Sequence, residues 1–180
     1  MRSPLLDAIG SIIGLFGQAE VTVGVASGLA VARARRDGWQ SGVVPLLIVV
    51  TILIEAILKT LIPHAPPPHD RSRTVELLPF VHVPFSGSFP SGHVARITFL
   101  AGIVRGTPSW LRAVAVLLMV TSRLYLGEHW LSDCIGGLAL GYLVSAGALF
   151  AERVLKRSPH TGERPRTYSL AAQDTTRHGK

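Results

Sequence analysis

Two short stretches of this chain carry side chains that could cleave a phosphate ester. Residues 89–93 have the sequence Phe-Pro-Ser-Gly-His, and further along the chain Ser122, Arg123, His129 and Asp133 follow one another closely. Together the stretches supply two imidazoles, a carboxylate, a guanidinium and a candidate helix N-terminus. These groups are sufficient to hold a phosphate and to break its ester without a metal ion.

The first stretch predicts a helix end that faces the phosphate. Pro90 and Ser91 are residue types preferred at helix starts, and Gly92 lets the backbone approach a ligand closely. Free N–H groups and the positive end of the helix dipole would then point at the anion. His93 is expected in the first turn, beside the phosphate.

The second stretch predicts a nucleophile with its orienting group. His129 and Asp133 are four residues apart, which would place them on one face of a helix. There the carboxylate holds one imidazole nitrogen protonated and leaves the other as the nucleophile. Arg123 cannot share this face, so Gly127 and Glu128 are expected to form a turn that folds its guanidinium over the site, where it binds two phosphate oxygens. Taken singly, each residue has a plainer explanation, such as an interfacial histidine or a helix-terminal aspartate; their conjunction favours catalysis.

Long apolar stretches must position these residues. Hydrophobic residues make up 48% of the 180 residues and charged residues only 16%. Several apolar runs approach the roughly 20 residues with which a helix crosses a bilayer. The sequence therefore predicts an all-α, polytopic membrane bundle with about five transmembrane helices, at 17–34, 43–62, 90–104, 110–126 and 131–150. Residues 4–15 are expected at the membrane interface. The alternatives are a sixth span near the N-terminus and a soluble helical bundle, which so small a protein disfavours.

Clusters of basic residues orient these helices. They follow the first expected span, lie between the third and fourth, and follow the fifth (Arg33, Arg35, Arg36, Arg105, Arg112, Arg153, Lys156 and Arg157). All fall on one side if the N-terminus is outside, and by the positive-inside rule that side is the cytoplasm. The site is thus expected on the outer face of a bacterial cytoplasmic membrane, with the C-terminus in the cytoplasm.

Two segments are expected outside the bilayer. The proline-rich residues 63–89 predict an irregular external loop over the site. Residues 158–180 predict a disordered basic tail that follows a membrane domain of residues 1–157. Because the basic clusters that flank the spans account for the net charge of +7, no nucleic-acid partner is expected.

Other sequence features say less about function. The only cysteine, Cys134, excludes an internal disulfide, and no cleavable signal peptide is expected. The spacings Gly24-xxx-Gly28 and Gly137-xxx-Gly141 favour close helix contacts within the bundle. The sequence does not assign an oligomeric state.

The two catalytic stretches resemble, in order and spacing, the second and third signatures of the type 2 phosphatidic acid phosphatase superfamily, in its membrane-bound, phosphatidylglycerophosphatase B-like branch. The similarity runs over residues 55–141. It implies that His129 attacks phosphorus and forms a phosphohistidine, that Asp133 orients this imidazole, and that His93 protonates the leaving oxygen. It also implies that no metal and no other cofactor is needed. The family positions that bind the phosphate match Ser91, Gly92 and Arg123.

The first signature of that family is incomplete here. The family has a lysine, six residues and then Arg-Pro. Lys59 and Pro67 match, but Pro66 stands at the arginine position, and a frequent second arginine falls on His64. One phosphate ligand is therefore missing or comes from elsewhere in the chain.

Three arginines are candidates for the missing ligand. Arg71 and Arg73 lie in the expected external loop, and Arg96 lies inside an expected span, where a charge usually faces a polar cavity or a partner. We expect Arg96 within reach of the phosphate or of its ligands, with Arg71 as the second candidate. The alternative is that Arg96 pairs across the bundle with Glu55, which is also the expected helical partner of Lys59.

These observations predict a metal-independent phosphatase that hydrolyses a lipid phosphate or a polyprenyl diphosphate within the membrane, such as undecaprenyl diphosphate or a phosphatidylglycerol phosphate. Two alternatives stay open. The same site could transfer the phosphate to another lipid or sugar hydroxyl. Without its arginine, the protein could also bind or transport a lipid phosphate without turnover.

Overall fold

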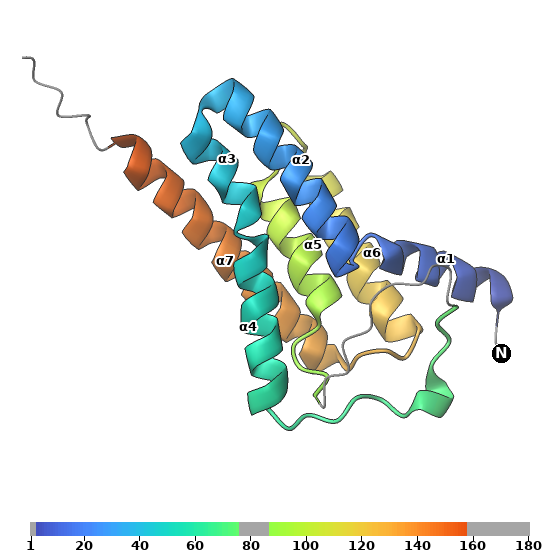
Figure 1. Cartoon of the computed structure of the whole chain (residues 1–180). Helices are drawn as coiled ribbons and strands as arrows, with labels where there is room; N and C mark the ends of the chain where they lie inside the picture. Colours follow the sequence, from blue (N-terminus) through green and yellow to red (C-terminus); the bar gives the residue numbers. More distant parts are fainter. Residues whose placement is uncertain (1–2, 76–86, 158–180) are drawn as a thin grey trace, which may run out of the picture.

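The computed structural model of the protein describes residues 3–75 and 87–157. Within these ranges the chain forms α-helices, one short 3-10 turn and loops, and no strand (Figure 1). The elements are α1 (Pro4–Leu15), α2 (Ala19–Asp37), α3 (Trp39–Leu46), α4 (Ile48–Leu61), η1 (His69–Arg71), α5 (Gly92–Ile103), α6 (Ser109–Tyr125) and α7 (Leu131–Arg157). The expected all-helical bundle is confirmed. The expected tail and the middle of the expected loop lie outside the described residues.

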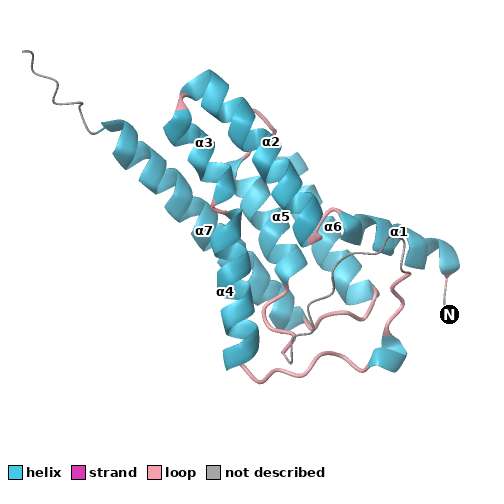
Figure 2. Cartoon of the chain, in the orientation of Figure 1, coloured by secondary structure: helices cyan, strands magenta, loops and turns pink. Residues whose placement is uncertain are grey.

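Helix α5 forms the centre of the bundle. It contacts α2, α3, α4, α6 and α7, and Figure 2 shows it enclosed by the surrounding helices while α1 projects to one side. The side chains of Val94, Phe99 and Ile103 on this helix are almost fully buried. Because α5 begins with the Ser-Gly-His sequence, the best-packed helix carries the first catalytic stretch at its N-terminus.

Two glycines of α7 allow it to pack closely on α5. A Cβ added to Gly137 would lie 2.5 Å from the carbonyl oxygen of Ser91, and one added to Gly141 would overlap the carbonyl oxygen of Ala95. The close contact predicted from this spacing is confirmed. In the described part of the chain, a Cβ on Gly24 or Gly28 would meet nothing within 4 Å, so the same prediction for that pair is wrong.

The helix expected at 43–62 begins earlier and contains a break. Helices α3 and α4 are separated at Leu47. Pro45 has no N–H and crowds the carbonyl four residues before it, which interrupts the regular hydrogen-bond ladder. The N–H groups of Leu47 and Val50 instead donate to carbonyls three residues back, those of Val44 and Leu47.

Helix α7 extends beyond its expected end and carries an ionic cluster there. Glu152, which is 2% exposed, accepts hydrogen bonds from Ser41 at 2.7 Å, from Arg33 at 2.9 Å and from Arg105 at 2.8 Å. Lys156 lies 3.1 Å from the same carboxylate. This cluster joins α2, α3, α7 and the turn after α5 at the end of the bundle away from the catalytic stretches.

The helices differ in their ability to cross a membrane. By length and composition, two helical segments among residues 3–75 and 87–157 could do so, Trp39–Leu61 and Leu131–Arg157, and a third could if α1 and α2, bent by 45°, form one span. At 12 residues, α5 is only about 18 Å long, against roughly 30 Å of hydrocarbon core. The count of five spans therefore stays a prediction.

Candidate active site

The two catalytic stretches meet in the structure through a backbone contact. The N–H of Ser91, the residue before α5, donates to the carbonyl oxygen of Asp133 in the first turn of α7 at 2.9 Å. Arg123 lies at the C-terminal end of α6, and the turn from α6 to α7 carries His129. The N-terminal ends of α5 and α7 and the C-terminal end of α6 thus carry the residues of the candidate site.

His129 and Asp133 form the expected pair, though by a different local structure. Nδ1 of His129 lies 3.2 Å from Oδ2 of Asp133. Helix α7 begins at Leu131, so His129 precedes the helix and does not share a helical face with Asp133. The fully buried Asp133 carboxylate also accepts the N–H of Trp130 at 3.0 Å, as a residue in the first turn of a helix can. The Asp133 carboxylate therefore binds both the backbone at the start of α7 and the imidazole of His129. Its contact with Nδ1 leaves Nε2 of His129 as the nitrogen that could react.

His93 lies among basic side chains. It sits in the first turn of α5, where Arg123, Arg96, His129 and Lys59 are close enough to interact with it electrostatically. The structure thus gathers side chains from both catalytic stretches and Lys59 from the incomplete first signature. Such a cluster of cations favours an anion at its centre.

Three donors in this cluster have no protein partner. Among the described residues, Oγ of Ser91, Nε2 of His93 and Nε of Arg123 are buried without a hydrogen-bond partner. A buried polar group left in this way costs about 1–3 kcal/mol. The oxygens of a phosphate would satisfy these atoms, and the chemistry of the donor set fits a tetrahedral anion.

The expected turn that returns Arg123 to the site is confirmed. Gly127 has φ +71°, a conformation that favours glycine, and the N–H of Glu128 donates to the carbonyl of Arg123 at 3.1 Å. The Arg123 side chain is 5% exposed, and its Nη2 donates to Oγ of Ser122 at 3.1 Å.

Helix α1 covers this side of the site, which the sequence did not predict. A Cβ on Gly14 would overlap the guanidinium of Arg123, and one on Gly17 would lie 2.7 Å from Cδ2 of His93. Oγ of Ser122 donates to the carbonyl of Gly10 at 2.8 Å. Gly10 and Gly14 are four residues apart on α1, so their spacing was the signal for a helix face that packs against another element.

Arg96 pairs with Glu55, which the sequence analysis gave as the alternative to a phosphate contact. Its Nη1 donates to Oε2 of Glu55 at 2.6 Å and its Nε to the carbonyl of Gly17 at 2.9 Å. Lys59 lies 2.9 Å from the other Glu55 oxygen, as expected for this helical pair. Because these two Arg96 donors are engaged, the contacts do not support a direct bond from them to phosphate. Arg96 reaches the expected phosphate ligand Lys59 through Glu55.

Glu55 also explains why position 92 is glycine. A Cβ on Gly92 would overlap the carboxylate of Glu55, which lies at the N-terminal end of α5, where the helix dipole favours a negative charge. The lack of a side chain at position 92 therefore leaves room for the carboxylate of Glu55. Phosphate binding by the backbone at Gly92 stays a prediction.

The described parts of the loop attach to the site at several points. Nε1 of Trp130 donates to the carbonyl of Ala65 at 2.9 Å. Nδ1 of His64 lies 3.0 Å from Oγ of Ser88 and 3.3 Å from Oδ1 of Asp133. The residue at the family's second arginine position thus lies next to the carboxylate of Asp133, a contact that the sequence did not predict.

A second attachment involves Glu128. The hydroxyls of Ser72 and Thr74 each donate to Oε1 of Glu128 at 2.6 Å. Burial raises the pKa of Glu128, but these two bonds and the nearby charges of Arg123 and His129 outweigh it, so the pKa lies below its ordinary value of 4.5.

The two loop arginines have different surroundings. The guanidinium of Arg73 stacks over the ring of Tyr125, 5.2 Å from its centroid. Arg71 lies in η1 beside Gly127, with an exposed side chain. Its role as a phosphate ligand stays a prediction.

The described residues include no group of three or more histidine, cysteine, aspartate or glutamate side chains that could hold a metal ion. That the reaction needs no metal stays a prediction.

The fold and the site define a helical membrane protein with a buried His–Asp pair beside clustered cations. The chain belongs to the PAP2 superfamily, whose family model matches residues 42–156. The predicted resemblance is confirmed.

Individual proteins resemble the chain over different lengths. It is 34% identical over 98 residues to the Escherichia coli K12 protein "Putative undecaprenyl-diphosphatase YbjG", a match of 52% of this chain and 48% of the relative. The chain therefore spans about half the length of that relative.

Two crystal structures share the fold at 24% identity. The first transmembrane PAP2 type phosphatidylglycerolphosphate phosphatase from Bacillus subtilis has a TM-score of 0.70, over 88% of this chain and 82% of that protein. Aquifex aeolicus LpxE has a TM-score of 0.61, over 83% and 88%.

Proposed function

We propose that this protein hydrolyses the phosphate ester or diphosphate of a membrane lipid through a phosphohistidine on His129. One observation carries the proposal. Nδ1 of His129 is held by the buried carboxylate of Asp133, beside a set of buried donors that lack partners in the described chain. A held imidazole next to an anion-binding cluster is the arrangement that nucleophilic attack on phosphorus requires.

The first step forms the covalent intermediate. The lone pair of Nε2 of His129 forms a bond to phosphorus, and the bond from phosphorus to the oxygen on the lipid side breaks with its electron pair. The negative charge of the bound phosphate favours a protonated imidazole at His93. His93 gives this proton to that oxygen, so the lipid leaves as an alcohol or a monophosphate. Asp133 stabilises the positive charge that develops on His129, while Arg123 and Lys59 stabilise the phosphoryl oxygens.

The second step releases the phosphate. A water molecule attacks phosphorus, the neutral His93 accepts one of its protons, and the phosphorus–nitrogen bond breaks with its electrons returning to His129. Both histidines regain their starting states. None of these steps calls on a metal ion.

A lipid substrate is supported by an apolar groove lined by sequence neighbours of the site residues. Helices α4 and α7 line a cavity of about 480 Å³, with Leu58, Leu140, Leu143 and Phe89 in its wall. Leu58 precedes Lys59, and Phe89 begins the first catalytic stretch. An acyl or prenyl chain in this groove would place its phosphate among the catalytic side chains. The names of the Escherichia coli and Bacillus subtilis proteins support two substrate classes, polyprenyl diphosphates and phosphatidylglycerol phosphates.

The decisive experiment traps the phosphoenzyme. Wild type incubated with radiolabelled polyprenyl diphosphate and quenched in base, which preserves phosphohistidine, should carry label and release phosphate in the presence of EDTA. His129→Ala should do neither, whereas His93→Ala should retain labelling when the leaving group is good. Equal labelling of wild type and His129→Ala would assign the nucleophile elsewhere, and activity lost in EDTA would contradict the metal-free mechanism.

The same assay separates the two other functions. Label that appears in a second lipid or a sugar shows transfer instead of hydrolysis. Tight retention of the lipid with no turnover shows a binding protein.

We also infer that the site faces outward and the C-terminus the cytoplasm. The basic residues at the Glu152 end of the bundle support this orientation by the positive-inside rule. In intact cells, an external protease should cut an epitope inserted after Asp70 and spare a tag after Lys180. The opposite pattern would place the site in the cytoplasm.

A further inference from the structure

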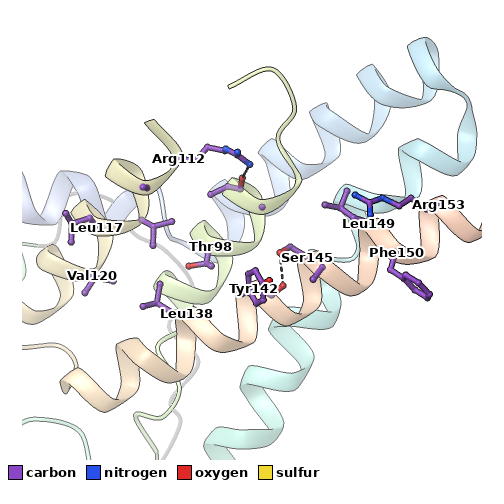
Figure 3. A pocket seen from close by; sticks show the side chains of 15 residues that line it. Thr98, Arg112, Leu117, Val120, Leu138, Tyr142, Ser145, Leu149, Phe150 and Arg153 are labelled. Carbon is purple, nitrogen blue, oxygen red and sulfur yellow. Dashed lines mark hydrogen bonds between the residues drawn. The ribbon is translucent and has the colours of Figure 1, made fainter. Parts of the chain in front are cut away.

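A second groove lies on the other side of α7, between α5, α6 and α7. It has a volume of about 710 Å³ and a mostly apolar wall that includes Val116, Leu117, Val120, Leu138, Leu149 and Phe150. Figure 3 shows the positions of Leu117 and Val120 on α6 and of Leu138, Leu149 and Phe150 on α7. Leu117 and Phe150 are 63% and 67% exposed, so the groove is open along the apolar flank of the bundle, where membrane lipid would reach it.

Two arginines line the groove, one from each outer helix. Arg112 is half-buried near the start of α6, and its Nη1 donates to the carbonyl of Ala101 at 3.3 Å. Its Nε is buried without a hydrogen-bond partner in the described chain. Arg153 on α7 makes no ion pair with any described residue, whereas Arg33 and Arg105 at the same end are paired with Glu152. The groove therefore combines an apolar wall with two positive charges that no carboxylate of residues 3–75 or 87–157 neutralises.

The groove is separate from the catalytic site. Val94, Met119 and Cys134 form a buried cluster between the two, and Val120 and Leu138 at the near end of the groove pack against it. Along the helices, Arg112 lies about three turns before Arg123, and Arg153 lies more than five turns after Asp133. A headgroup held by these arginines would not be the phosphate that His129 attacks.

We propose that this groove binds an anionic phospholipid of the leaflet opposite the catalytic site. An acyl chain lies along the wall formed by α6 and α7, and the phosphodiester accepts hydrogen bonds from Arg112 and Arg153. Guanidinium groups match phosphate oxygens in pairs, and an arginine at membrane depth is expensive unless it meets such a partner. In the predicted orientation, this end faces the cytoplasmic leaflet, where anionic lipids attract basic residues.

The proposal is tested by native mass spectrometry of the full chain in detergent, incubated with phosphatidylglycerol or with phosphatidylcholine of the same acyl chains. Wild type should retain phosphatidylglycerol preferentially. The double variant Arg112→Gln/Arg153→Gln should retain roughly tenfold less of it, because two charges near the headgroup are lost. Arg157→Gln, one turn further along α7 and not part of the groove wall, is the matched control and should behave as wild type.

A second variant tests the apolar part of the groove. Ala146 lines the groove and is exposed, so Ala146→Phe should fill the groove without disturbing the core and should also lower retention. Circular dichroism and a single elution peak establish that each variant is folded. Undiminished retention in both folded variants, equal retention of phosphatidylcholine by wild type, or an equal loss in Arg157→Gln would each overturn the proposal.

Discussion

Nδ1 of His64 lies 3.3 Å from Oδ1 of Asp133, across the carboxylate from the oxygen that holds His129. Nδ1 of His64 also lies 3.0 Å from Oγ of Ser88, and the Ser88 side chain interacts with the Asp133 carboxylate as well. The orienting carboxylate therefore has an imidazole on each side. At a position where the family often has arginine, this chain places a group whose charge depends on its protonation.

We expect His64→Ala to slow the reaction without abolishing the covalent intermediate. The substitution removes a neighbour of Asp133 but leaves the His129 contact in place, so kcat should fall by roughly 5- to 30-fold, the effect of about 1–2 kcal/mol. His64→Gln, which can still bond to Ser88, is the matched control. A loss as large in His64→Gln as in His64→Ala would assign the effect to the imidazole itself, and unchanged pH–rate profiles in both variants would leave His64 only a packing role.

Asp133→Asn should bind substrate but turn it over far more slowly. The amide cannot stabilise an imidazolium on His129, and neutralising such a carboxylate in a serine protease triad lowers kcat by roughly 10⁴-fold. Because Asp133 also accepts the N–H of Trp130, the variant should lose about 1 kcal/mol of stability, a typical value for a helix cap. A large rise in KM with kcat preserved would mean that Asp133 serves binding or folding instead of nucleophile orientation.

Gly14→Ala should weaken phosphate binding more than it weakens the fold. The added methyl group would overlap the guanidinium of Arg123, and the end of a flexible side chain can move aside where backbone could not. Arg123 should therefore lose its position, with KM rising severalfold while the unfolding temperature changes little.

Gly24→Ala is the control for this experiment. A Cβ at Gly24 meets nothing within 4 Å in the described chain, so the substitution should leave KM unchanged and gain about 0.5–1 kcal/mol of helix stability. Equal KM values for Gly14→Ala and wild type would show that α1 does not position Arg123.

Arg96→Ala should destabilise the protein by about 3–5 kcal/mol, because it leaves the buried Glu55 carboxylate with one cation fewer. The Arg96 and Glu55 side chains are each only 7% exposed. Arg96→Lys should restore part of the stability, since one ammonium group cannot serve both Glu55 and the carbonyl of Gly17. Thermal unfolding in detergent measures both effects. If Arg96→Ala instead raises KM with stability unchanged, Arg96 is the direct phosphate ligand that the sequence suggested.

Acid should release the loop segment that bonds to Glu128. The pKa of this carboxyl is lower in the folded protein than its ordinary value of 4.5, so the attachment contributes its full stability above that value and loses it as the pH falls through the lowered folded pKa. Hydrogen exchange at residues 72–75, corrected for the intrinsic rate, should therefore accelerate below pH 4.5. Glu128→Gln should exchange rapidly at neutral pH and show no further acid step, and an acid step of the same size in that variant would assign the effect to another group.

The sequence predicted several contacts of the candidate site because its motifs depend on local backbone structure. The turn at Gly127 and the pair of Lys59 with Glu55 arise from neighbours along the chain. The relation of His129 to Asp133 was predicted as a contact but with the wrong local structure. The separation of four residues along the sequence suits one face of a helix. In the structure, Asp133 lies in the first turn of α7, and its carboxylate contacts His129, which precedes the helix.

Contacts between distant segments could not be predicted in the same way. Arg96 has the same local surroundings whether it faces Glu55 or a phosphate, and only the packing of α4 on α5 decides between them. The glycines of α1 did not predict the contact with Arg123, because spacing alone does not say which helix a small-residue face will meet. The break at Leu47, by contrast, has a local cause in Pro45, which the sequence analysis did not use.

Because α1 covers the site, the part of the chain that builds the site includes this helix. The family model begins at residue 42, yet Gly14 abuts the guanidinium of Arg123, and Gly17 abuts His93 and accepts the Nε–H of Arg96. A protein trimmed to residues 42–156, or a chimera that borrows only this part, would keep the catalytic side chains and lose the wall behind them. The segment that matches the family model is therefore shorter than the segment that builds the site. Truncated proteins, chimeras and comparisons between relatives should include α1.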